Sequence, residues 1–198
     1  MGAAQVPCPS PVLNKCKNHG FTLVELMVTL SIVVILATLA VPSFRALIAS
    51  TRMTSQANEF VAMLAFTRSE AVKRNARVTM CKSSDSTSCT TTGTWAQGYI
   101  VFTDAGATIG TVDSGEDVLR VSPALTNGST LVGSADVAGP PVVLGVANFL
   151  SFLSNGQSTQ SGKWDLCPAT TSLPGRDIVL VAATGSPTVA KDTTLPCS

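Results

Sequence analysis

Histidine and charged side chains are scarce in this chain. His19 is the single histidine, and Lys, Arg, Asp and Glu together make up 13% of the 198 residues. If the segment that ends at Gly20 is removed during maturation, no histidine remains, which excludes Ser–His and Cys–His nucleophilic pairs and a histidine general base. The sequence also has no GxxxxGKS/T phosphate loop and no CxxC pair for zinc. We therefore expect a protein that is not an enzyme and that binds no metal or cofactor.

The charge that is present is nearly balanced. The whole chain carries +1 at pH 7, and Lys15 and Lys17 are the charged residues before Phe21, so residues 21–198 carry −1 (+1 minus 2). This balance argues against nucleic acid as the default partner. A local cluster of cations is interpreted as a solvated face or as contacts within an assembly; it comprises Arg68, Lys73, Arg74 and Arg77.

A long apolar stretch, Phe21–Val41, dominates the hydropathy pattern. No charged residue occurs between Leu26 and Phe44, and a helix of about 20 apolar residues is long enough to cross a bilayer. The two lysines before it favour a cytoplasmic N-terminus and export of the rest. Glu25 lies near one end of the span, where a carboxylate is costly, and such a cost indicates a function for it.

Helical periodicity continues beyond Pro42. Apolar residues such as Phe60 and Leu64 recur every three to four positions. The pattern predicts one helix of about 55 residues from Phe21 to about Ala76, apolar all round in its first half and amphipathic in its second. Pro42 lacks an amide hydrogen, which predicts a kink there.

After this helix the sequence changes to short β-rich runs separated by Gly, Asn, Asp, Ser and Pro clusters. This alternation predicts an α+β fold, in which the amphipathic half of the helix covers one face of an antiparallel sheet or small sandwich. The expected strands are Arg77–Cys81, Gly98–Thr103, Asp117–Val121, Val142–Leu144, Phe149–Leu153 and Asp177–Ala182.

Four cysteines follow the apolar stretch and would lie in an oxidising compartment, where they can form two disulfides. Of the three connectivities, we favour Cys81–Cys89, which closes a short loop, and Cys167–Cys197, which holds the C-terminus. Five acids are interpreted as solvated, because they lie in turn-like segments. These acids are Asp104, Asp113, Glu116, Asp117 and Asp136. A calcium site that uses Asp113, Glu116 and Asp117 is the alternative, although the EF-hand pattern is absent.

The segment around Gly20 is similar to the cleavage and assembly motif of type IV prepilins and type II secretion pseudopilins. The resemblance rests on Lys17-Asn-His-Gly20, on Phe21-Thr-Leu-Val-Glu25-Leu-Met and on the later Pro42. It implies that a prepilin peptidase cleaves between Gly20 and Phe21 and methylates the new amine of Phe21. It also implies that Thr22, Glu25 and Pro42 serve assembly. The Glu25 carboxylate has two candidate partners, the amine of its own Phe21 one helical turn away and the Phe21 amine of an incoming neighbouring subunit.

The rest of the chain resembles the GspH/FimT family of minor pilins and pseudopilins. The resemblance implies a long helix on an antiparallel β-domain, other pilins or pseudopilins as partners, and a place in the inner membrane and then in a pilus or pseudopilus. It predicts a leader over residues 1–20, a transmembrane and assembly helix over 21–48 and a periplasmic domain over 49–198. The matching segments are Phe66–Cys81, Trp95–Asp104, Val118–Arg120 and Phe152–Gly156.

Two alternatives stay open. Some FimT-type proteins take up DNA and carry a Gly-Arg-x-Arg motif near the C-terminus, but here Ser186 and Thr188 follow Gly185 where the arginines would be. The second alternative is a secreted domain that is cleaved after the apolar stretch, near Ala40. The sequence does not choose between a pilus and a type II secretion pseudopilus.

Overall fold

The computed structural model describes residues 21–134, 145–169, 175–181 and 183–191. The chain divides into two compact units, Met1–Ser43 and Phe44–Ser198, and each is described by itself. The helix α1 (Leu23–Arg74) has 52 residues and belongs to both units. The predicted single long helix is therefore confirmed, and the helix continues through Pro42 without interruption.

The helix α1 ends where the backbone adopts a left-handed conformation. Asn75 has a φ of 51°, a conformation that asparagine tolerates better than most residues. The amide of Ala76 donates to the carbonyl of Ala71 at 3.2 Å, and the amide of Asn75 donates to the carbonyl of Val72 at 3.3 Å. This is the bonding of a Schellman cap, which satisfies carbonyls left open at a helix end.

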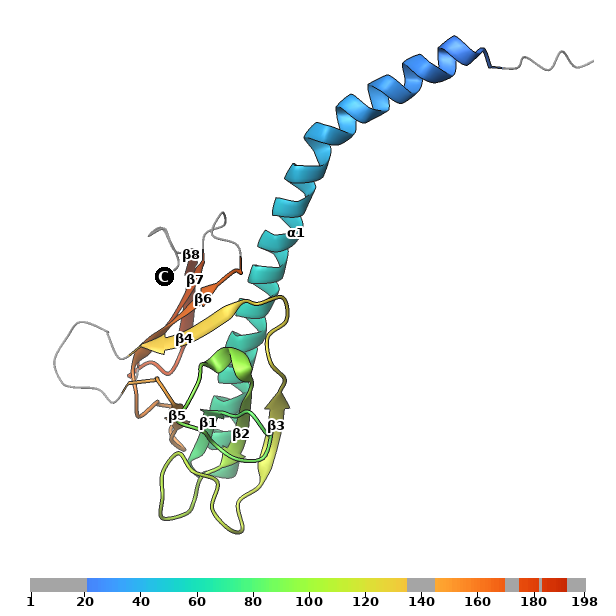
Figure 1. Cartoon of the computed structure of the whole chain (residues 1–198). Helices are drawn as coiled ribbons and strands as arrows, with labels where there is room; N and C mark the ends of the chain where they lie inside the picture. Colours follow the sequence, from blue (N-terminus) through green and yellow to red (C-terminus); the bar gives the residue numbers. More distant parts are fainter. Residues whose placement is uncertain (1–20, 135–144, 170–174, 182, 192–198) are drawn as a thin grey trace, which may run out of the picture. The chain divides into compact units, whose positions relative to one another are not determined.

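The strands of the second unit form two four-stranded antiparallel sheets (Figure 1). The first sheet has the order β3-β2-β1-β5, and its strands are β1 (Val78–Lys82), β2 (Tyr99–Thr103), β3 (Val118–Ser122) and β5 (Phe149–Phe152). The second has the order β4-β6-β7-β8, and its strands are β4 (Thr130–Ser134), β6 (Gly162–Cys167), β7 (Arg176–Leu180) and β8 (Pro187–Lys191). The predicted long helix with an antiparallel β-domain is confirmed.

Three strands of the second sheet were missed by sequence reasoning: β4, β6 and β8. The signal in β6 was present, since Lys163 and Asp165 alternate with the buried Trp164 and Leu166, which is the period of a half-buried strand. β8 begins with Pro187 at the edge of its sheet, where a missing amide is tolerated. The predicted strand Val142–Leu144 lies outside the described residues.

Phe60 of α1 joins the helix to both sheets. Its ring makes edge-to-face contacts with Trp95, Tyr99 and Trp164, with ring centroids 5.7, 5.3 and 5.1 Å away. Tyr99 belongs to β2 in the first sheet and Trp164 to β6 in the second. All four rings are almost completely buried. The predicted amphipathic half of the helix therefore supplies the centre of the core.

The central strands of the first sheet, β1 and β2, are buried on both faces. Met80 and Val101 face the core that contains α1, whereas Cys81, Ile100 and Phe102 form a smaller apolar cluster on the other face. Because side chains alternate along a strand, continuous burial of β1 requires cover on each side.

Asp104 corrects one expectation, because it is fully buried and not a solvated turn residue. Its Oδ1 pairs with the Arg77 guanidinium at 3.2 Å, while Oδ2 accepts bonds from the Thr79 hydroxyl and from the Gly110 amide. These partners compensate the desolvation of the carboxylate. Asp104 thereby attaches the loop between β2 and β3 to the first sheet.

Tyr99 should make the second unit sensitive to alkali. Burial raises the pKa of Tyr99 to about 12 from an ordinary value of 10.0. Between pH 10 and 12 the unfolded phenol loses its proton while the folded one keeps it, so stability falls over this window, by about 2 to 3 kcal/mol at its upper end. The chain has one tyrosine, so tyrosinate absorbance reads this group directly.

We expect the absorbance midpoint near pH 12 in the folded chain and near pH 10 in denaturant. Tyr99→Phe is the control, and it should remove the loss of stability in this window. Equal midpoints in the folded and denatured chain would contradict this account of the burial of Tyr99.

Candidate functional site

The start of α1 carries two of the three residues that sequence analysis assigned to assembly, Thr22 and Glu25. Thr22 immediately precedes the helix, and its hydroxyl accepts a hydrogen bond from the Glu25 amide at 3.2 Å. The Leu26 amide donates to the Thr22 carbonyl, also at 3.2 Å. Thr22 is thus an N-cap residue, and the Thr-x-x-Glu spacing is that of a capping box. This gives Thr22 a local function that the sequence analysis did not identify.

Glu25 keeps its carboxylate available for a partner. The capping bond uses its backbone amide, and its side chain is exposed and has no hydrogen-bond or ion-pair partner among the described residues. The first turn of a helix favours a negative charge, because the amide dipoles point their positive ends there. The structure therefore leaves a stabilised but unpaired acid at the start of an apolar helix.

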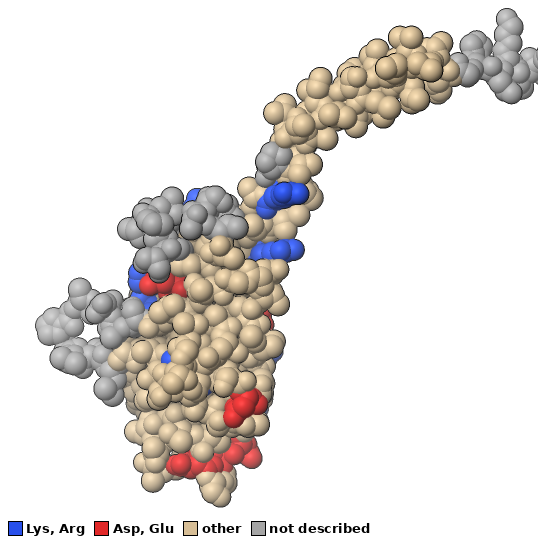
Figure 2. Space-filling model, in the orientation of Figure 1, with Lys and Arg blue, Asp and Glu red and all other residues tan. Residues whose placement is uncertain are grey.

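The helix that follows exposes apolar surface along its length. Residues 21–43 are exposed apart from Pro42, whose side chain is not described, and Phe21 is 84% exposed. The face seen in Figure 2 presents uncharged side chains along this part. By length and composition alone, α1 is the helix in the described part of the chain that qualifies as a membrane span. So large an apolar surface requires an apolar environment, either lipid or other helices.

The few hydroxyl groups in this apolar part are satisfied within the helix. Each donates to a backbone carbonyl three or four residues earlier, at 2.7 to 2.9 Å. Such bonds let Ser and Thr enter an apolar phase without an unsatisfied donor. The residues are Thr29, Ser31 and Thr38.

The sequence-predicted processing and assembly residues are only partly described. Phe21, Thr22 and Glu25 lie within one turn of each other at the start of α1. Gly20 lies outside the described residues, and Pro42 lies within the helix, about five turns further along the chain.

One of the two expected disulfides is present. Cys81 and Cys89 are joined, with their Cα atoms 5.6 Å apart. Cys89 packs against the apolar cluster on the outer face of the first sheet. Cys197 lies outside the described residues, so the Cys167–Cys197 pairing stays a prediction.

The cation cluster that the sequence suggested is divided among different partners. Lys73 and Arg74 both pair with Glu70, at 3.3 and 2.7 Å, and Arg77 pairs with the buried Asp104. Arg68 instead donates to the Ser186 hydroxyl at 3.0 Å. With these interactions in place, the four cations do not form the row of free positive charges that phosphate binding uses. DNA binding stays an untested alternative.

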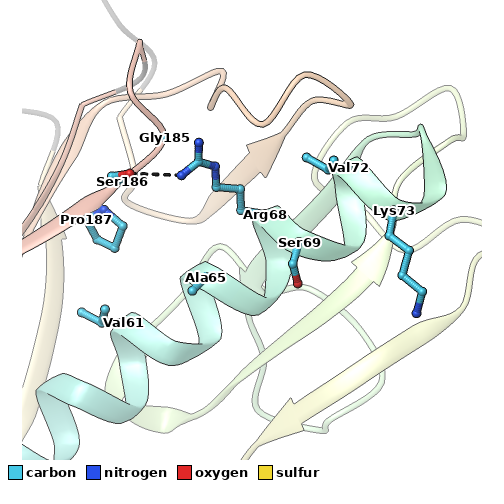
Figure 3. Close-up of a pocket in the computed structure, with 9 residues that line it drawn as sticks. All are labelled: Val61, Ala65, Arg68, Ser69, Val72, Lys73, Gly185, Ser186 and Pro187. Atoms are coloured by element: carbon cyan, nitrogen blue, oxygen red, sulfur yellow. Dashed lines mark hydrogen bonds between the residues drawn. The ribbon is translucent and has the colours of Figure 1, made fainter.

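A groove beside α1 is a feature that sequence reasoning did not find. It lies between the helix and the turn that leads into β8, and Figure 3 shows Arg68 extending from the helix toward Ser186. No local pattern brings these segments together, because residues 68 and 186 are 118 positions apart.

Comparisons with known proteins give two matching family models and two similar solved structures. The family model described as type II transport protein GspH matches residues 56–185, and a prokaryotic N-terminal methylation motif matches residues 15–41. The type IV minor pilin FimU of Pseudomonas aeruginosa is 20% identical with a TM-score of 0.53, over 75% of this chain and 96% of FimU. The minor pseudopilin EpsH from the type 2 secretion system of Vibrio cholerae is 12% identical with a TM-score of 0.47, over 71% and 97%. Comparison with curated proteins finds no match.

Proposed function

Because the chain belongs to the type II transport protein GspH family of minor pilins and pseudopilins, we propose that it is a minor subunit of a type IV pilus or type II secretion pseudopilus. A prepilin peptidase cleaves it between Gly20 and Phe21 and methylates the Phe21 amine. The mature chain then enters a fibre through its helix, where it helps to start or extend assembly.

The unpaired Glu25 carboxylate is the observation that carries this proposal. Cleavage after Gly20 creates a cationic amine at Phe21, within one helical turn of Glu25. The Thr22 bond leaves the Glu25 side chain unused, so the carboxylate is available to the amine of an adjacent subunit. An apolar environment strengthens such a pair and makes an unpaired charge costly. Pairing between subunits therefore gives assembly both a driving force and an axial register.

The exposed apolar part of α1 suits two environments that follow one another, the membrane and then the fibre. Before assembly, the helix is held in the inner membrane, with the N-terminus in the cytoplasm and the β-domain in the periplasm. In a fibre, the helices of neighbouring subunits replace the lipid. The partners are thus the prepilin peptidase, the inner membrane and other pilins or pseudopilins. In this function the chain is a structural subunit and not a catalyst.

Mass spectrometry of the membrane-extracted protein tests the processing step. We expect a mature chain that begins with N-methylated Phe21. Gly20→Glu should leave an uncut precursor of higher mass, because a side chain at the cleavage point obstructs the close approach of the peptidase to the backbone.

Ser10→Glu is the matched control, since it adds the same charge to the leader away from the cut and should be processed normally. A mature terminus near Ser43 would contradict the proposal and support the secreted-domain alternative. A Gly20→Glu chain of mature mass would contradict cleavage at this bond.

A further inference from the structure

Two arginines lie on α1 near the start of the second unit. Arg45 and Arg52 are both exposed, and they are seven positions apart, so they share one face of the helix. Neither makes an ion pair or a side-chain hydrogen bond within the described part of the chain. On the face seen in Figure 2, basic side chains lie along the helix beside the β-domain, and acidic side chains gather at the opposite end of the unit. The helix therefore begins its course along the β-domain with unpaired positive charge.

The second sheet adds two cations on the other side of the helix. Arg176, the first residue of β7, is the register partner of Lys191, the last residue of β8. Arg176 is also the register partner of Leu166, which belongs to the core that contains α1, so this row of side chains faces the helix. Arg176 Nη2 donates to the Thr54 hydroxyl of α1 at 3.4 Å. Because Thr54 is about 200° around the helix from Arg52, the sheet pair and the helix pair lie on opposite sides of α1.

These four cations have no acid to balance them among the described residues. Along α1, Glu25 is followed by no acid before Glu59. The acid next to Arg176 in β7 is Asp177, which alternates to the other face of the sheet and pairs with Lys163 at 3.9 Å. Like charges directly opposite each other on neighbouring strands are destabilising. The cross-strand pair of cations therefore favours an anion from outside the chain.

The cations also lie at the depth at which a membrane-spanning helix meets lipid headgroups. Residues 21–43 extend over about 34 Å as a helix, slightly more than the hydrocarbon core of about 30 Å. Arg45 follows directly, and Arg52 lies about 10 Å further along the axis. Long side chains on a helix lean toward its N-terminus, here toward the membrane, and arginine can extend its charge to the interface. Arginine also suits phosphate, because its planar guanidinium can bind two phosphate oxygens at once.

We propose that these four cations bind the phosphate groups of anionic phospholipids in the membrane that holds α1. We call them the basic collar, which consists of Arg45, Arg52, Arg176 and Lys191. The inference rests on the proposed membrane location of α1, and it adds a contact between the β-domain and the lipid surface. The contact belongs to the state before assembly, because in a fibre the helices of other subunits replace the lipid.

The lipid selectivity of the full chain in vesicles tests the collar. Chains are reconstituted in phosphatidylcholine with a trace of spin-labelled phosphatidylglycerol or spin-labelled phosphatidylcholine, and electron spin resonance measures how strongly each associates with the protein. All chains carry Lys15→Gln and Lys17→Gln, so the cations of the leader do not contribute. One cation near an anionic surface is equivalent to about a fivefold preference, and we expect at least about this preference for phosphatidylglycerol. It should vanish in about 1 M salt, where the Debye length is about 3 Å.

Neutral substitutions identify the residues that carry the preference. Arg45→Gln combined with Arg52→Gln should lower it at least about twofold. Arg176→Gln combined with Lys191→Gln should do the same, and all four together should abolish it. Arg176→Lys keeps the charge and should keep the preference. Arg68→Gln, about 24 Å beyond Arg52 along α1, is the matched control and should change nothing. An unchanged preference in the fourfold variant would overturn the collar.

The outcomes separate this inference from the proposed function. Chains that resist alkaline extraction from the vesicles are inserted, and if they show no preference for phosphatidylglycerol they overturn the collar and leave the proposed function intact. Chains that do not insert would count against both. Collar variants that keep the lipid preference but enter fibres poorly would assign the cations to contacts with other pilins and would also overturn the lipid contact.

Discussion

Replacing Glu25 with alanine should leave cleavage of the leader intact and lower incorporation of the chain into fibres by about a hundredfold or more. The estimate follows from the environment of the pair, because leaving one partner of a buried ion pair uncompensated costs about 3 to 5 kcal/mol. The helix start itself should survive, since Thr22 bonds the backbone amide at position 25 and not the side chain. The loss would therefore reflect pairing between subunits and not unfolding of the first turn.

Quantitative immunoblotting of sheared fibres against the membrane fraction measures this effect. Glu59→Ala, which removes an exposed acid further along α1, is the matched control and should be incorporated normally. Thr22→Val separates capping from pairing, because losing the cap should cost only about 1 kcal/mol. Normal incorporation of the Glu25→Ala chain would rule out pairing as the basis of assembly.

Phe60→Ala should produce the largest loss of stability in the β-domain, about 3 to 5 kcal/mol. The substitution removes a fully buried ring that contacts aromatic side chains of both sheets, so it leaves a cavity where helix and sheets meet and also deletes edge-to-face contacts.

Denaturant unfolding of the detergent-solubilised full chain, followed by tryptophan fluorescence, measures this loss. The chain has two tryptophans, and both Trp95 and Trp164 contact Phe60, so the signal comes from the region that is changed. Val72→Ala on the exposed face of the same helix is the control, with an expected change within about 0.5 kcal/mol. Equal unfolding midpoints for the two variants would show that Phe60 is not the centre of the core.

Local features of the structure were predictable because their signals lie within a few residues. The apolar run, the 3.6-residue period around Phe60 and Leu64, and the β-rich runs at Val78 and Tyr99 all predict their elements. The Cys81–Cys89 bridge is likewise local, since it closes a separation of eight residues. In the second sheet, the glycine in β4 obscured the strand pattern, and only pairing with the neighbouring strand decides such a case. The alternation in β6 was present in the sequence and was overlooked.

Gly133 illustrates why β4 was missed. Glycine weakens a strand signal, yet in the structure a Cβ at Gly133 would lie 2.4 Å from the Val146 carbonyl and 2.8 Å from Trp95 Nε1. The glycine is therefore required by a contact with segments distant in sequence. The same reason explains Asp104. Its local sequence is that of a solvated turn, but in the tertiary structure its carboxylate pairs with Arg77 and accepts a hydrogen bond from Thr79.

The sequence by itself determined that this chain has a long helix with an apolar first half, an acid one turn inside it, a β-domain beyond it and the motifs of a minor pilin or pseudopilin. These follow from short-range patterns of hydropathy and motif spacing. Only the tertiary structure decided that Asp104 is buried, that Arg68 is fixed between two glycine turns and that a groove opens beside it. Those properties depend on packing between residues far apart in the chain, which no local pattern contains.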